Sequence, residues 1–114
     1  GFLLAFSSPG QGVECAIAIQ RAFSRYNEEH AEQPIRVRIG LHSGEAIKDA
    51  NKFFGKTVIL ASRIADQARP NEILVSSALK ELVESSRDLR FDEGRDLSLK
   101  GLAGTYRAHA VSWT

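Results

Sequence analysis

The chain has 114 residues, 43% of them hydrophobic and 25% charged, which is ordinary for one globular domain or part of one. Its 15 basic and 14 acidic side chains leave a net charge of +1, so neither a nucleic-acid polymer nor an anionic membrane surface is indicated as a partner. Apolar runs are far shorter than the ~20 residues that a membrane span needs.

The single cysteine, Cys15, excludes an intramolecular disulfide and fits a reducing compartment, so we expect a cytoplasmic protein. The chain contains no Met and begins with apolar residues, of which 2–6 have the pattern of a buried strand. A native protein rarely begins inside a buried strand. We therefore expect a fragment of a longer protein.

A helix is predicted next. Ser8, followed by Pro9 and Gln11, has the pattern of a capping box with proline at the first helical position. Apolar residues then recur every three or four positions, which predicts an amphipathic helix to about residue 29. Residues 35–42 alternate between apolar and polar, which predicts a strand with one buried face.

The second half of the chain continues to alternate between strands and helices. Residues 46–48 have the pattern of a returning strand, and 57–68 that of a helix that packs closely through small residues. A strand at 73–75, a helix capped by Ser77 that ends near residue 86, and strands at 97–100 and 106–113 follow. This order predicts an α+β fold, with one sheet and its helices on one face.

Three stretches carry a family resemblance: Val-Arg-Ile-Gly-Leu-His-Ser-Gly-Glu at 37–45, Phe-Phe-Gly-Lys-Thr-Val-Ile-Leu-Ala-Ser-Arg-Ile at 53–64, and Leu-Lys-Gly at 99–101 followed by Tyr106. In order and spacing they resemble the catalytic domain of class III adenylate and guanylate cyclases. Residues 1–6 are similar to the segment that follows the family's second metal-binding Asp. The resemblance implies a ferredoxin-like α/β sandwich of the nucleotidyl cyclase type, of which residues 1–114 form a part that lacks the N-terminal elements.

The resemblance also implies an activity. Such domains convert ATP or GTP into the cyclic 3′,5′-nucleotide and pyrophosphate for signal transduction, in a homodimer whose two subunits share each active site. Two Asp residues hold Mg²⁺ or Mn²⁺, as in two-metal phosphoryl transfer. Both Asp positions are expected before Gly1, so we expect no metal ligand in this chain and no activity from the chain alone.

Five positions match functional positions of the family. Arg63 matches the Arg that stabilises charge on the α-phosphate, and Lys100 the Lys that contacts the outer phosphates. Ile59 occupies the position of the Asn that orients the ribose, and it cannot form a hydrogen bond through its side chain. Lys52 occupies the base-selecting position, which is usually Asp in adenylate-specific members, and Phe53 lies beside it with its backbone near the expected base.

From the residues alone, other interpretations stay open. Arg63 could be a surface ion-pair partner, Lys100 a solvated cation, and Phe53 a residue of the core or of an interface. His42 and Glu45 are too sparse for a metal site. Beside an enzyme, the sequence allows a non-catalytic cyclase-like module for regulation or dimerisation. An RNA-binding module is disfavoured by the neutral charge and by the lack of an aromatic strand face.

Overall fold

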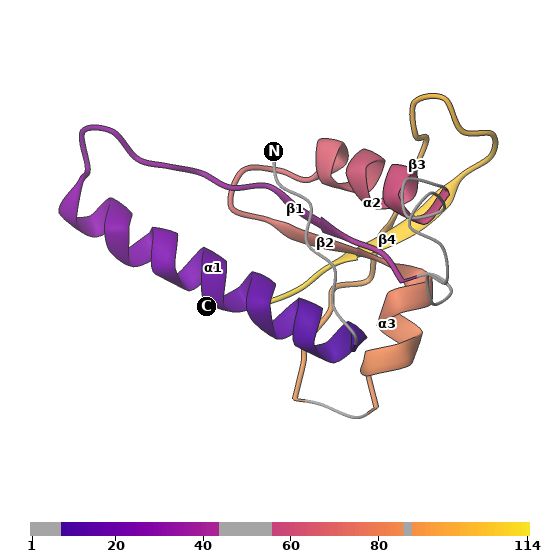
Figure 1. Cartoon of the computed structure of the whole chain (residues 1–114), viewed down its shortest axis with the longest axis horizontal. Coiled ribbons are helices and arrows are strands. Elements are labelled where there is room, and N and C mark those ends of the chain that lie inside the picture. The colour runs from indigo at the N-terminus through magenta and orange to yellow at the C-terminus, as the bar shows by residue number, and fades with distance from the viewer. Residues whose placement is uncertain (1–7, 44–55, 86–87) are drawn as a thin grey trace.

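The computed structural model describes residues 8–43, 56–85 and 88–114. Within them a four-stranded sheet has the strand order β1-β2-β4-β3 (Figure 1). Its strands are β1 (Ile39–Leu41), β2 (Ile73–Ser76), β3 (Arg95–Leu97) and β4 (Tyr106–Ala110). β1 runs parallel to β2, whereas β4 is antiparallel to both of its neighbours. The described residues also form three helices, α1 (Pro9–Glu29), α2 (Lys56–Gln67) and α3 (Ser77–Val83), which lie along the chain where helices were predicted.

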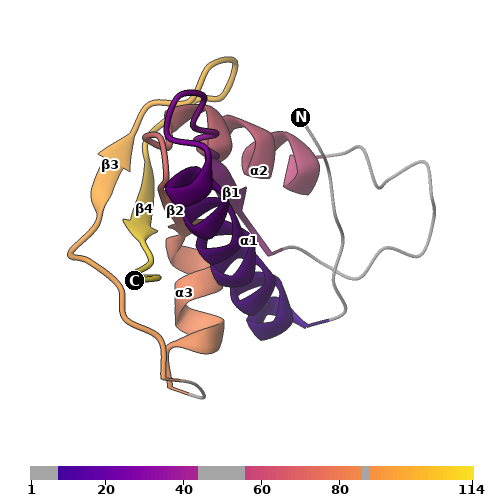
Figure 2. The ribbon, with the colours of Figure 1, turned by 90° about the vertical axis from the view of Figure 1, so that its left-hand side faces the viewer.

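The helices cover both faces of the sheet. Ile73 and Val75 pack into one core with residues of α1 and α3, whereas Leu74 packs into a second core with residues of α2. Alternate residues of a strand point to opposite faces, so α2 lies across the sheet from α1 and α3 (Figures 1 and 2). The expectation of helices on one face was wrong. All four residues of β2 are buried, and the consecutive apolar residues Ile73, Leu74 and Val75 need cover on both sides of the strand.

The first helix has the predicted length, but its start differs in detail. Pro9 occupies the first turn and Ser8 is the N-cap in an extended conformation, yet the Ser8 side chain makes no capping hydrogen bond. The predicted capping box is therefore wrong. Farther along, the polar side chain of Gln20 is 1% exposed. Its Nε2 donates to the carbonyl oxygen of Val37 at 2.9 Å, which ties α1 to the segment before β1.

β1 is much shorter than the strand predicted at 35–42. The backbone N–H and C=O of Ile35 both pair with the side-chain amide of Asn27, at 2.7 and 2.8 Å. The carbonyl of Val37 accepts from Gln20 and from the backbone N–H of Asn71. These groups are satisfied by a side chain or a loop rather than by a neighbouring strand, so the ladder begins only at Ile39.

The later elements differ from prediction mainly at their ends. Ser76, and not Ser77, caps α3, because its Oγ accepts the N–H of Leu79 at 3.2 Å. α3 ends at Val83, and β3 begins two residues and ends three residues earlier than predicted. The strands predicted at 2–6 and 46–48 fall outside the described residues.

Candidate active site

α2 presents two of the predicted site residues on one side. Ile59 and Arg63 are four residues apart and therefore lie on the same helix face. Ile59 is 43% exposed, and the Arg63 side chain is 37% exposed. An adjoining side of α2 buries Leu60 and Ile64 in the second core. The amphipathic pattern of α2 thus holds Ile59 and Arg63 toward solvent.

The guanidinium of Arg63 is held only weakly. Its Nη1 lies 3.4 Å from Oδ2 of Asp66, one turn farther along α2, in a pair that is open to solvent on both sides. Exposed pairs of this kind contribute roughly 0–1 kcal/mol. The Arg63 Nε is buried and has no hydrogen-bond partner among the described residues. An incoming anion can therefore replace Asp66 as the partner of Arg63 at little cost in free energy.

Lys100 lies in the connection between β3 and β4. The neighbouring Leu99 is 3% exposed and fixes this connection to the second core, while Lys100 itself is exposed. Gly101 follows with a φ of +79°, a conformation that side chains rarely adopt. The N–H of Leu102 donates to the carbonyl of Leu99 at 3.1 Å and closes the turn. A buried anchor and a tight turn thus hold Lys100 out into solvent.

Arg63 comes from α2 and Lys100 from the β3–β4 connection, and neither residue lines either of the two cavities of about 220 and 240 Å³. Lys52 and Phe53 lie outside the described residues, and their placement stays a prediction.

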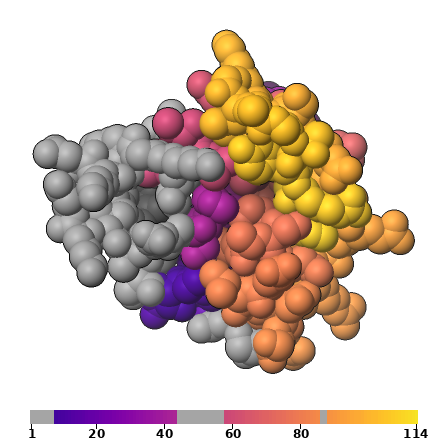
Figure 3. Space-filling view, turned by 90° about the vertical axis from the view of Figure 1, so that its right-hand side faces the viewer, coloured from indigo at the N-terminus to yellow at the C-terminus, as the bar shows by residue number. Residues whose placement is uncertain are grey.

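A cavity of about 220 Å³ opens beside the inner side of α2. Leu60 and Ile64 of α2 form its apolar part, and the other lining residues are His42, Ser76, Ser77, Ala78, Thr105, Tyr106 and Arg107. The segments that contribute them, the end of β1, the start of α3 and the start of β4, come together on the face shown in Figure 3. In the wall of this cavity, His42 Nδ1 lies 2.8 Å from Ser76 Oγ.

Sequence reasoning did not identify this polar wall. Ser76 and His42 are 34 residues apart, and Ser77 and His109, whose Oγ and Nε2 lie 3.1 Å apart, are separated by 32. No local pattern links such residues, because the pairing depends on how the strands align in the sheet. The buried His109 is bonded as expected for a satisfied histidine, since its Nδ1 lies 3.1 Å from the carbonyl oxygen of Asp92.

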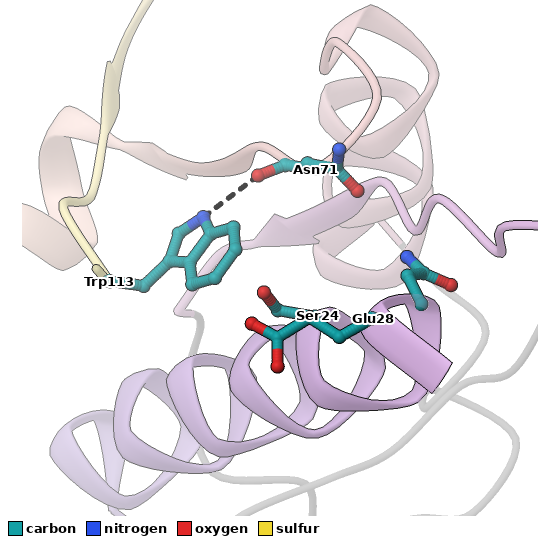
Figure 4. Close-up of a pocket in the computed structure, with 5 residues that line it drawn as sticks. Ser24, Glu28, Asn71 and Trp113 are labelled. Atoms are coloured by element: carbon teal, nitrogen blue, oxygen red, sulfur yellow. Dashed lines mark hydrogen bonds between the residues drawn. The ribbon is translucent and has the colours of Figure 1, made fainter. Parts of the chain in front are cut away.

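A second cavity, of about 240 Å³, lies between the last turns of α1, the α2–β2 connection and the C-terminal segment. Ser24, Asn27, Glu28, Asn71 and Trp113 line it. The indole N–H of Trp113 donates to the carbonyl oxygen of Asn71 at 2.8 Å (Figure 4). Ile59, Arg63 and Lys100, the predicted site residues that the structure describes, do not border this cavity.

The C-terminal end of α2 is fixed by an ion pair. Arg95 Nη2 lies 2.7 Å from Glu72 Oε1 and also donates to the carbonyl oxygen of Gln67, the last residue of α2, at 3.2 Å. Partial burial raises the pKa of Glu72, but the hydrogen bonds from Arg95 and the Arg69 amide outweigh burial and hold that pKa below its ordinary value of 4.5. The same hydrogen bond with Glu72 raises the pKa of Arg95.

The described residues do not fit a resident metal ion. They contain no group of three or more His, Cys, Asp or Glu side chains placed to bind one. They also contain no helix long and apolar enough to cross a membrane.

Comparison with known proteins shows which family the chain belongs to. The sequence pattern of the adenylate and guanylate cyclase catalytic domain matches residues 7–112. A putative adenylate cyclase 3 of Rhizobium meliloti is 33% identical over 92 residues, which are 80% of this chain but 16% of that protein. A guanylate cyclase of Toxoplasma gondii is 37% identical over 82 residues, 65% of this chain and 2% of that protein.

The fold comparison agrees. The crystal structure of an adenylate/guanylate cyclase/hydrolase from Silicibacter pomeroyi matches 93% of this chain and 63% of that chain, with a TM-score of 0.79 at 22% identity. The predicted fold class is therefore confirmed. The chain spans only a small part of the curated relatives it matches, about a sixth or less of the two named above. This chain belongs to the adenylate and guanylate cyclase catalytic domain family.

Proposed function

We propose that the full-length protein converts ATP or GTP into the cyclic 3′,5′-nucleotide and pyrophosphate, as a homodimer that signals through this product. Family membership supports the reaction class. The observation that carries the proposal is the state of Arg63: a cation on the outer side of α2 whose described ion-pair partner is an exposed carboxylate of the same helix. Such a group is available to a phosphate that approaches from outside the chain.

The chemistry of the two exposed cations fits triphosphate recognition. A guanidinium offers several N–H donors to phosphate oxygens, and donors aimed at charge that develops in the transition state lower the barrier. Lys100 presents a second, more compact positive charge from a different element. In the proposed roles Arg63 stabilises the α-phosphate in the transition state, and Lys100 binds the outer phosphates.

The exposure of these residues favours a shared site. Arg63 does not line the cavity that Leu60 and Ile64 border, and its side chain is 37% exposed. It is therefore open to a substrate that rests on another surface. We propose that this surface is a second copy, so that Arg63 and Lys100 complete the site of the partner subunit.

The full-length enzyme is expected to need Mg²⁺ or Mn²⁺ on the two Asp residues that the resemblance places before Gly1. The described residues offer no ligand cluster for these ions. Lys52 at the base-selecting position leaves ATP and GTP as equal candidates.

The test is to supply the full-length protein with ATP or GTP and Mn²⁺ and to quantify cyclic nucleotide and pyrophosphate. Arg63→Ala should lower kcat by about 10²–10³-fold. Arg25→Ala is a control, because Arg25 is an exposed arginine of α1 that lines neither cavity. An R25A enzyme as impaired as R63A, or a dimeric wild-type protein without cyclic product, would count against the proposal.

Ile59 favours a second candidate, a non-catalytic cyclase-like module for regulation or dimerisation. Its side chain is 43% exposed on the side of α2 that carries Arg63, and it cannot make the hydrogen bond of the Asn that the family has there. Ile59→Asn in the full-length protein separates the candidates. A large rise in cyclase rate marks a weakened enzyme, and an unchanged, negligible rate supports the regulatory module.

A further inference from the structure

Gly40, in the middle of β1, lies against the backbone of α2. A Cβ built on Gly40 would lie 2.3 Å from the backbone N of Ala65, 2.6 Å from its Cα and 2.8 Å from the carbonyl oxygen of Ala61. Backbone atoms cannot rotate away as a side chain can. Any side chain at position 40 must therefore move β1 and α2 apart, by about 1 Å to reach ordinary van der Waals contact.

The strand is the better-fixed member of this contact. β1 is paired with β2 along its length, and Ile39 and Leu41 pack against the core on the far side of the sheet. α2 has solvent on its outer side, and its inner residues Leu60 and Ile64 border a cavity. If a side chain at position 40 forces β1 and α2 apart, α2 is therefore the element that we expect to move.

Arg63 moves with α2. It stands between Ala61 and Ala65 in the sequence, and its ion-pair partner, Asp66, belongs to the same helix. No hydrogen bond or ion pair joins Arg63 to another described element. The position of the guanidinium is therefore set by where α2 lies on the sheet.

We propose that Gly40 is a positioning residue for Arg63, because its missing side chain sets how closely α2 approaches the sheet. This inference rests on the proposed function, in which Arg63 meets the nucleotide of the partner subunit. A misplacement of about 1 Å can cost about 10²-fold in rate. Since Arg63 would act on charge that develops in the transition state, the loss appears in kcat and not in KM.

The test compares Gly40→Ala with Gly104→Ala in the full-length protein. Gly104 is a control for backbone strain without displacement: its φ is +83°, and an added Cβ would meet nothing within 4 Å. Both variants should unfold at lower temperature, so rates are measured where circular dichroism shows both folded. We expect kcat to fall about 10- to 100-fold in G40A alone. An equal fall in G104A, or a change of KM alone in G40A, would overturn the inference.

A double variant tests whether Gly40 acts through Arg63. In an Arg63→Ala background, Gly40→Ala should lower kcat by less than about twofold, because the group that it misplaces is already gone. A full additional loss would show that Gly40 acts by another route.

Crystal structures of wild type and G40A in one crystal form separate this inference from the proposed function. An α2 shifted by about 1 Å from β1 supports it, and an unmoved α2 overturns it. If the wild-type protein makes no cyclic nucleotide, the proposed function fails, and the position of α2 alone decides whether Gly40 sets the place of Arg63.

Discussion

Arg95 binds the Glu72 carboxylate through both terminal nitrogens, with Nη2 2.7 Å from Oε1 and Nη1 3.2 Å from Oε2. The pair joins β3 to the connection between α2 and β2 and is largely shielded from solvent. Two parallel hydrogen bonds between charged groups are stronger than one exposed contact. This pair therefore fixes the end of the helix that carries Arg63.

The first prediction concerns pH. The folded state holds the pKa of Glu72 below 4.5, so its stabilising contribution is complete above that value and is lost as pH falls through the lower folded pKa. Glu72→Gln should lower the free energy of unfolding by about 1–2 kcal/mol at pH 7, and by less at pH 3. Urea unfolding at both pH values measures the difference. Asp96→Asn, in an exposed pair with Arg107, is the control and should change little.

The second prediction concerns Gln20. Its buried amide donates to the carbonyl of Val37 and, more distantly, at 3.4 Å, to that of Glu72. Gln20→Leu keeps an apolar stem but removes the donor, so it should destabilise the protein by about 1–3 kcal/mol. Gln33→Leu, at an exposed loop position, should be nearly neutral in the same thermal unfolding assay. Equal effects would mean that the buried bridge adds no stability.

The third prediction distinguishes two adjacent serines. Ser76 Oγ accepts the N–H of Leu79, whereas Ser77 Oγ pairs with His109 Nε2. Ser76→Ala should cost about 1 kcal/mol and speed amide exchange at Leu79. Ser77→Ala should leave exchange at Leu79 unchanged. Faster exchange at that amide in S77A instead would assign the cap to Ser77.

The fourth prediction tests the turn that holds Lys100. Gly101 and Gly104 have φ values of +79° and +83°, and an added Cβ meets nothing within 4 Å at either position. Alanine should thus strain both backbones similarly, by about 1 kcal/mol. If Lys100 binds phosphate, Gly101→Ala should raise KM for the nucleotide in the full-length enzyme more than Gly104→Ala does. Equal KM values would argue against that role.

The sequence predicted those features that depend on local periodicity. The apolar repeat of α1 gave its span correctly, and the four-residue spacing of Ile59 and Arg63 gave their common helix face. β1 was predicted too long because side chains of Asn27 and Gln20, from a different element, take the backbone groups that a strand partner would otherwise bind.

Features that depend on the relation between elements escaped prediction. The contact of Gly40 with α2 depends on the distance between the helix and the sheet. No spacing of residues in the sequence indicates that distance. The same holds for the two-sided cover of β2. The roles assigned to Arg63, Ile59 and Lys100 rest on resemblance and stay predictions, as do those of Lys52 and Phe53 outside the described residues.

Asn27 has a consequence beyond the length of β1. Ile35 is 41% exposed and β-branched, a residue that readily joins a strand of another molecule. The Asn27 amide occupies both the N–H and the C=O of Ile35, and Pro34 beside it has no N–H to offer. Backbone groups that are already bonded cannot pair with a strand of another molecule. One asparagine thus blocks such pairing at Ile35.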